Sequence, residues 1–290
     1  MSCESVPPVE GPVAVLGAGT MGRGIAHVSA LAGFETRLFD IEAGILDQAF
    51  EAVKADLDKG VALGKVEQTD RDGALDRFHT TTDLQVALDG SGIVIEAVPE
   101  RLDLKQSVLR SVADHVSPIA MIASNTSSLS ISALAATVAG PERVVGLHFF
   151  NPVHIMALVE VVRGERTTER VVEQAQQFAE RLGKTPIVVR DSPGFASSRL
   201  GIALGLEAIR MVEEDVASPQ DIDRAMELGY RHPMGPLKLT DVVGLDVRLE
   251  IARYLNQALG GDRFRPPKLL ERMVEEGRLG KKTGGGFYDW

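Results

Sequence analysis

The chain has 290 residues, of which 44 % are hydrophobic and 25 % are charged, and its formal net charge is -10. This length predicts two domains, each with enough residues to bury its own core. The negative charge argues against a nucleic-acid partner, and no apolar run approaches the roughly 18 residues that a membrane span needs.

The N-terminal tail, residues 1–11, is expected to be loose. Cys3 is the one cysteine of the chain, so a disulfide framework is impossible, which fits a reducing cytosol. The first ten residues have neither a basic start nor an apolar centre, so we expect no secretion signal. These features predict a cytoplasmic protein.

A glycine-rich segment follows the first predicted strand. The apolar run 12–16 is typical of a buried parallel strand, and residues 23–32 are expected to form a helix that ends at Gly33. Glycines between strand and helix allow a tight turn, close approach of a pyrophosphate and close helix–strand packing, while the N–H groups of the helix start face the phosphates. We therefore predict a dinucleotide site in the segment Gly17-Ala18-Gly19-Thr20-Met21-Gly22.

An acidic residue ends the second predicted strand, residues 35–39. A carboxylate at Asp40 can accept hydrogen bonds from both ribose hydroxyls and repels a 2′-phosphate, and no arginine follows it. NAD is therefore favoured over NADP. FAD uses the same glycine pattern, but the histidine chemistry described below favours a nicotinamide.

Strands and helices continue to alternate. The helix expected at 42–64 carries Lys59, and Lys65 follows it; these lysines either form a solvated face, the more common role, or meet an anionic substrate. Residues 67–79 are polar and are expected to be a connection only. The alternation predicts an α/β Rossmann-like doubly wound sheet. Its further elements are expected at 92–98 (strand), 102–116 (helix), 120–123 (strand) and 129–139 (helix).

Five small polar residues, 124–128, follow one of these strands. Such a run forms either a helix-capping turn or a set of hydrogen-bond donors to a ligand, and the residue pattern leaves both interpretations open.

Two short apolar strands around a break at Asn151-Pro152 contain a histidine and a glutamate. If the chain folds back at His154, antiparallel pairing places His148 opposite Glu160 on one face of the sheet. An imidazole beside a carboxylate in an apolar surround is a good proton acceptor near neutral pH, and the carboxylate stabilises the imidazolium. The alternative is a histidine that is satisfied by packing, with Glu160 on a solvated edge.

The last third of the chain is expected to contain helices only. A helix at 171–182 and a strand at 186–189 close the first domain, residues 1–190, and a turn-rich boundary leads to the second, residues 191–290. The chain ends in a glycine turn with an aromatic plug, and we expect no metal site. Helices are expected at 195–213, from Pro219 after a capping Ser218, near 244–259 and at 266–277.

From about residue 12 to 290 the sequence resembles the 3-hydroxyacyl-CoA dehydrogenase family, and more closely its short, single-function bacterial 3-hydroxybutyryl-CoA dehydrogenase type. The resemblance implies a Rossmann-like domain, a helical substrate and dimerisation domain, a homodimer, and reversible NAD-dependent oxidation of (S)-3-hydroxyacyl-CoA to 3-oxoacyl-CoA. It rests on the blocks 17–26, 124–129, 146–152, 158–161, 232–236 and 280–288.

The resemblance also implies roles for single residues. His148 matches the catalytic base and Glu160 its carboxylate partner, while Ser127 matches a serine near the substrate's 3-oxygen and the nicotinamide. Asp40 matches the ligand of the adenosine ribose. Further cofactor contacts are matched by Glu100, Lys105, Asn151 and Lys282.

Two positions depart from the family pattern. Ser198 stands before Arg199 where the family has an asparagine, which removes an amide beside the reacting oxygen. We expect a water to bridge from the shorter Ser198 side chain; the alternative is that Ser198 only caps or packs, with Ser127 and His148 sufficient. Leu63 stands where a lysine is expected near coenzyme A, and Lys59 or Lys65 could substitute for it.

Two other functions are compatible with parts of the pattern. A dehydrogenase of a free hydroxy acid, related to gulonate dehydrogenase, would carry a different stretch around the histidine, and the pair Phe149-Phe150 argues for the acyl-CoA branch. An idle NAD-binding protein of the lens-crystallin kind would show no turnover above background.

Overall fold

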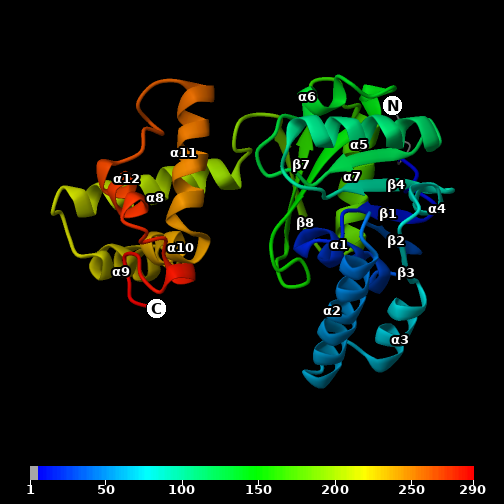
Figure 1. The fold of residues 1–290 in the computed structure, drawn as a ribbon, viewed down its shortest axis with the longest axis horizontal. Helices are drawn as coiled ribbons and strands as arrows, with labels where there is room; N and C mark the ends of the chain where they lie inside the picture. The colour runs from blue at the N-terminus through cyan, green and yellow to red at the C-terminus, as the bar shows by residue number, and fades with distance from the viewer. Residues whose placement is uncertain (1–5) are drawn as a thin grey trace. The chain divides into compact units, whose positions relative to one another are not determined.

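The structure is a computed structural model that describes residues 6–290; Cys3 lies outside the described residues. The chain divides into two compact units, Met1–Ser192 and Pro193–Trp290, close to the boundary expected at residue 190 (Figure 1). No helix in the described range has both the length and the apolar character that crossing a membrane requires.

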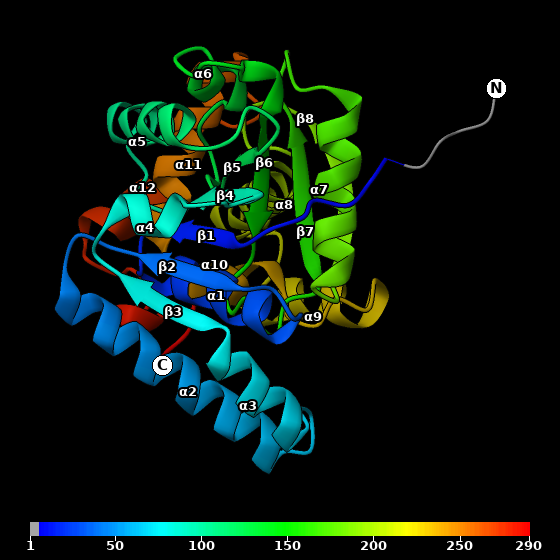
Figure 2. The same cartoon turned by 90° about the vertical axis from the view of Figure 1, so that its right-hand side faces the viewer.

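The first unit is built on one sheet with the strand order β3-β2-β1-β4-β5-β6-β7-β8 (Figure 2). Neighbouring strands are parallel, except that β7 is antiparallel to β6. The order reverses between β1 and β4, which is where such sheets bind dinucleotides. The strands are β1 (Val13–Leu16), β2 (Thr36–Phe39), β3 (Phe78–Thr81), β4 (Ile93–Glu96), β5 (Met121–Ser124), β6 (Val144–Phe149), β7 (Leu158–Arg163) and β8 (Thr185–Arg190).

The two faces of this sheet differ in chemistry. One face contributes apolar side chains to a core shared with helices α1 (Thr20–Leu31), α2 (Ala43–Ala62), α3 (Gln68–Asp76) and α7 (Glu169–Arg181). Helices α4 (Leu84–Leu88), α5 (Leu102–His115) and α6 (Ile131–Ala135) pack on the strands from the other side. Successive strand residues point to opposite faces. The second face therefore receives the polar side chains of Glu96, Ser124, His148 and Glu160.

The segment 67–79, which we expected to connect the long helix to the residues that follow, forms α3 and begins β3, and neither element was predicted. Two buried apolar side chains, Ala74 and Phe78, hold these elements against the core, while most of their other residues are exposed. Strand β3 lies at the edge of the sheet and needs few apolar residues, so its polar composition did not predict a strand. Helices α2 and α3 lie side by side (Figures 1 and 2).

The described part of the N-terminal tail is tied to α7. The carbonyl oxygens of Val6 and Pro7 accept hydrogen bonds from the side chains of Gln177 (3.1 Å) and Gln174 (3.3 Å).

The second unit is helical, which confirms the predicted class of a Rossmann-like doubly wound sheet followed by an all-α domain. Ser218 caps α9 as predicted: its hydroxyl oxygen accepts the backbone N–H of Asp221 at 3.2 Å, and Pro219 is the first helical residue. Helix α10 was not predicted. The helices are α8 (Ser197–Glu213), α9 (Pro219–Gly229), α10 (Pro236–Val243), α11 (Leu245–Leu259) and α12 (Lys268–Glu275).

The C-terminal residues close over a buried carboxylate of α10. Asp241, which is fully buried, accepts the backbone N–H groups of Phe287 and Tyr288, both at 2.9 Å, and the indole N–H of Trp290 at 3.0 Å. The aromatic plug expected from the sequence is thus held by polar contacts as well as by apolar packing.

His27 is a titratable group inside the first unit. It is buried in α1, and its ring stacks on that of His154 with 5.5 Å between centroids. Burial, and then the neighbouring His154, lower the pKa of His27 to about 4, although Asp56 acts in the opposite direction. The unfolded chain therefore binds a proton at this position more readily than the folded chain.

We predict that His27 makes the protein acid-sensitive. Its contribution to stability is present above pH 6.5 and is lost as the pH falls toward 4, because the unfolded state is then protonated first. Between pH 7 and 4.5 the free energy of unfolding of the wild type should fall by up to about 2.5 kcal/mol more than that of His27→Gln, measured by urea titration. The exposed His115→Gln should follow the wild type; equal pH slopes for wild type and His27→Gln would contradict the prediction.

Candidate active site

The predicted dinucleotide loop lies at the carboxyl end of β1, beside the point between β1 and β4 where the strand order reverses. Gly17 has a φ of 101°, a conformation that favours glycine. A Cβ at Gly22 would lie 1.7 Å from the carbonyl oxygen of Gly17, so only glycine lets the first turn of α1 close on the loop. Helix α1 begins at Thr20 with Gly19 as its N-cap. The first N–H groups of a helix have no partner within it and form a site for anionic phosphate.

The Asp40 side chain reaches back over this loop. Its Oδ2 accepts the backbone N–H of Ala18 at 2.8 Å, and its Oδ1 accepts that of Glu42 at 3.2 Å. A carboxylate offers about four acceptor positions, so capacity for further hydrogen bonds remains. The acid is therefore fixed at the end of β2, where the adenosine ribose is expected.

A buried ion pair lies beneath the carboxyl edge of the neighbouring strands. Lys105 in α5 is 1 % exposed, and its Nζ lies 2.6 Å from Glu96 Oε1, 3.0 Å from the carbonyl oxygen of Val98 and 3.2 Å from Glu100 Oε2. Burial raises the pKa of Glu96, and Lys105 and a hydrogen bond from Ser124 (2.6 Å) act against that rise. Three protein acceptors match the three ammonium protons, so Lys105 organises the site; its direct contact with the cofactor stays a prediction.

Glu100 organises the small polar run 124–128, for which the sequence left two interpretations open. Its Oε1 accepts the hydroxyl of Thr126 at 2.5 Å and the backbone N–H groups of Ser127 and Ser128 at 2.9 and 3.2 Å. Burial alone would raise the pKa of Glu100, but the hydrogen bond from Thr126 and the charge of Lys105 lower it below its usual range. An ionised carboxylate thus holds the turn that presents the exposed Ser127.

The predicted register between β6 and β7 is confirmed, with His148 opposite Glu160. His148 Nδ1 lies 2.7 Å from Glu160 Oε2, and both side chains are buried, with no exposed surface on Glu160. The ring centroid of Phe150 is 4.5 Å from that of His148. The pair therefore has the geometry and apolar surround that a carboxylate-oriented histidine requires, and the interpretation of Glu160 as a solvated edge residue was wrong.

The remaining predicted residues lie in four places. Asn151 is exposed in the turn after β6, and Lys59 and Lys65 are exposed at the end of α2, where Leu63 is the C-cap. Ser198 lies in the first turn of α8, in the second unit. Lys282, also in that unit, makes an ion pair with Asp246 at 2.5 Å. Their contacts with cofactor and substrate stay predictions.

Sequence reasoning missed Glu96, and it singled out Ser124 and Asn125 only as members of the polar run 124–128, without a separate role for either. Asn125 Oδ1 accepts the backbone N–H of Phe149 at 2.9 Å and so ties the polar run to β6. An acid inside an otherwise apolar strand, at Glu96, was the available signal, because a buried carboxylate requires a partner.

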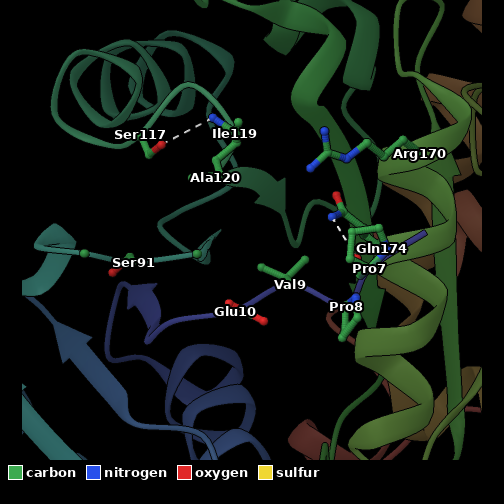
Figure 3. Close-up of a pocket in the computed structure, with 12 residues that line it drawn as sticks. Pro7, Pro8, Val9, Glu10, Ser91, Ser117, Ile119, Ala120, Arg170 and Gln174 are labelled. Carbon is green, nitrogen blue, oxygen red and sulfur yellow. Dashed lines mark hydrogen bonds between the residues drawn. The ribbon is translucent and has the colours of Figure 1, made fainter. Parts of the chain in front are cut away.

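A cavity of about 350 Å³ lies at the opposite edge of the sheet (Figure 3). Its lining comes from the segments that precede β1, β4 and β5, with Arg170 and Gln174 from α7. Ligands of such sheets bind at the carboxyl ends of the strands, so this cavity is not the candidate active site.

A glycine loop where the strand order reverses, with an acid over it at the end of β2, defines a dinucleotide-binding protein. Residues 12–192 match the model of the 3-hydroxyacyl-CoA dehydrogenase NAD binding domain, and residues 194–290 match that of the C-terminal domain of the same enzymes. The chain belongs to the 3-hydroxyacyl-CoA dehydrogenase family, and its cofactor is NAD.

Individual relatives match over nearly the whole chain. A probable 3-hydroxybutyryl-CoA dehydrogenase of Deinococcus radiodurans is 43 % identical over 95 % of this chain and 99 % of its own length. A 3-hydroxyadipyl-CoA dehydrogenase of Escherichia coli is 43 % identical over 96 % of this chain and 58 % of its own. The crystal structure of (S)-3-hydroxybutyryl-CoA dehydrogenase from Ralstonia eutropha has a TM-score of 0.93 and 39 % identity, and the match covers 96 % of this chain and 98 % of that one.

We predict that Asp40 sets the preference for NADH over NADPH. Repulsion of a 2′-phosphate should give NADH at least about a tenfold advantage in kcat/KM, or roughly 1.4 kcal/mol. Asp40→Ala should narrow this ratio, while Glu42→Ala, which changes the next acid along, should leave it in place. Similar kcat/KM values for the two cofactors with the wild type would refute the prediction.

Proposed function

We propose that the protein oxidises (S)-3-hydroxyacyl-CoA to 3-oxoacyl-CoA, reversibly and with NAD. The observation that carries the proposal is the buried His148–Glu160 pair, at 2.7 Å, on the same sheet as the NAD-binding loop. Family membership and relatives named 3-hydroxybutyryl-CoA dehydrogenases support the acyl-CoA class over a free hydroxy acid.

The chain's own residues handle the proton and the geometry. Bound NAD would supply the hydride-accepting chemistry at C3 of the substrate. His148 removes the proton of the 3-hydroxyl group through Nε2, while Glu160, at Nδ1, orients the ring and stabilises the imidazolium. Ser127 donates a hydrogen bond to the developing carbonyl oxygen, and Ser198 reaches the same oxygen through a bridging water. In the reverse direction the imidazolium returns its proton.

Binding of the cofactor and of coenzyme A uses the carboxyl edge of the sheet and the end of α2. The N–H groups of residues 17–22 receive the pyrophosphate and Asp40 receives the ribose. Lys59 and Lys65, both exposed, pair with the phosphates of coenzyme A in place of the lysine that Leu63 replaces. Glu100, Lys105, Asn151 and Lys282 complete the cofactor site.

We also propose a cytoplasmic homodimer that forms through the second unit. Helices α8 and α10 pack together and leave apolar side chains exposed, including Leu200, Val242 and Val243. Covering these side chains with the same surface of a second copy would remove apolar area from water.

We predict that loss of the histidine abolishes most turnover. His148→Gln keeps a similar shape but cannot carry the proton, so kcat with acetoacetyl-CoA and NADH should fall by about 10² or more, with NADH affinity unchanged. Glu160→Gln should also slow turnover. The exposed His115→Gln serves as the control.

Two results would overturn this mechanism. One is near wild-type kcat in both active-site variants under conditions where chemistry limits the rate. The other is wild-type turnover of free 3-hydroxy acids in preference to acetoacetyl-CoA, which would move the protein to the free-acid class.

We predict a dimer at micromolar concentration, with a mass twice that of the chain by light scattering. Val243→Glu places a charge in the exposed apolar surface of α10 and should yield monomers, because a buried unpaired charge is costly. A matched change at the exposed Ile119 of the first unit should leave the dimer intact. A monomeric wild type would contradict the proposal.

A further inference from the structure

The second unit contains a buried arginine that nothing in the proposed function uses. Arg248 in α11 is 8 % exposed, and its Nε is buried without a hydrogen-bond partner. Within residues 6–290 its guanidinium group makes no ion pair. Burial lowers the pKa of Arg248 to about 10, so the group is still a cation at neutral pH. A buried charge without a partner weakens a fold unless a ligand compensates it.

Two glycines of α8 make room for this guanidinium group. A Cβ at Gly201 would lie 3.5 Å from Arg248 Nη1, and one at Gly205 would lie 3.8 Å from the same atom. Gly201 and Gly205 are four residues apart and therefore share one face of α8. The neighbouring Thr240 donates its hydroxyl to the carbonyl oxygen of Pro236 at 2.8 Å, and within residues 6–290 no hydrogen bond joins it to this guanidinium group.

The same face of α8 contains Ser198. At about 100° per residue, Gly201 and Gly205 lie within roughly 60° of Ser198 around the helix, and at 1.5 Å per residue they lie about 4.5 and 10.5 Å further along its axis. The guanidinium group is therefore placed one to two helical turns from the side chain that the proposed mechanism assigns to the substrate's 3-oxygen.

We propose that Arg248 binds the terminal carboxylate of a 3-hydroxyacyl-CoA whose acyl group is a short dicarboxylic acid. This inference rests on the proposed function, in which Ser198 reaches the 3-oxygen of the substrate through a bridging water. An extended chain advances about 1.2 Å per bond, so a carboxylate carbon at C6 lies about 3.6 Å beyond C3. A charge-assisted hydrogen bond of about 2.8 Å extends this reach to a guanidinium nitrogen. The total is comparable with the separation of about 4.5 to 10.5 Å between Ser198 and the two glycines along α8.

A carboxylate suits this position better than other anions. Guanidinium and carboxylate groups form paired, parallel hydrogen bonds, and the pair neutralises a charge that the protein leaves uncompensated. The phosphates of coenzyme A are at the opposite end of the thioester from the acyl terminus, so they do not compete for this side chain. An uncharged acyl chain would leave Arg248 unpaired.

The test compares two substrates of equal chain length, 3-hydroxyadipyl-CoA and 3-hydroxyhexanoyl-CoA, at saturating NAD. The wild type should prefer the dicarboxylic substrate by at least about tenfold in kcat/KM. Arg248→Met should lower kcat/KM for 3-hydroxyadipyl-CoA by about 10- to 100-fold, mainly through KM, and change that for 3-hydroxyhexanoyl-CoA by less than about threefold. Arg248→Lys should retain part of the preference.

Arg253→Met provides the matched control. Arg253 is on the same helix, is exposed and already pairs with Glu271 at 3.1 Å, so its loss should leave the substrate ratio unchanged. The melting temperature of Arg248→Met should equal or exceed that of the wild type, because the variant no longer buries an uncompensated charge.

Three outcomes would overturn the inference. The first is a wild type with no preference between the two esters. The second is an equal loss on both esters in Arg248→Met, which would give the arginine a structural role. The third is an Arg248→Met variant that keeps the wild-type ratio of kcat/KM for the two esters but forms a weaker dimer, which would assign the guanidinium group to a partner subunit. Failure of the proposed function is distinct, because the wild type would then turn over neither ester.

Discussion

The carboxyl edge of the first unit depends on one buried ammonium group. Lys105 joins α5 to β4 through Glu96, and through Glu100 it reaches the turn that follows β5. Removing the lysine would leave a buried carboxylate without its charge partner, which costs several kcal/mol in comparable cases. Ser127 and the loop around it are therefore positioned by electrostatics inside the protein, before any ligand arrives.

The antiparallel direction of β7 relative to β6 is the second constraint on the site. A strand parallel to β6 would require a crossover from the other end of the sheet, whereas the connection 150–157 folds the chain back and brings Glu160 opposite His148. Because side chains alternate along a strand, this register also places both groups on the face that receives Glu96 and Ser124. One face of the sheet thus holds the polar chemistry, and the other holds the main apolar core.

Local sequence signals predicted the parts of the molecule that obey short-range rules. The glycine turn, the acid at Asp40 and the pairing of His148 with Glu160 follow from spacing, since strand period and turn position fix them. The edge strand β3 and helix α3 were missed because tertiary packing of Ala74 and Phe78 outweighed a polar composition. Long-range partners such as Lys105 with Glu96 have no pattern along the chain, and only the folded arrangement identifies them.

The closure of the C-terminal residues over Asp241 has a practical consequence for handling the protein. The last residues supply N–H donors to the Asp241 carboxylate, which has no exposed surface, so they stabilise the interior of the helical unit. Shortening the chain before Phe287 would leave that carboxylate buried with several of its donors gone. Truncated variants should therefore retain residues 287–290, because this segment completes the interior of its domain.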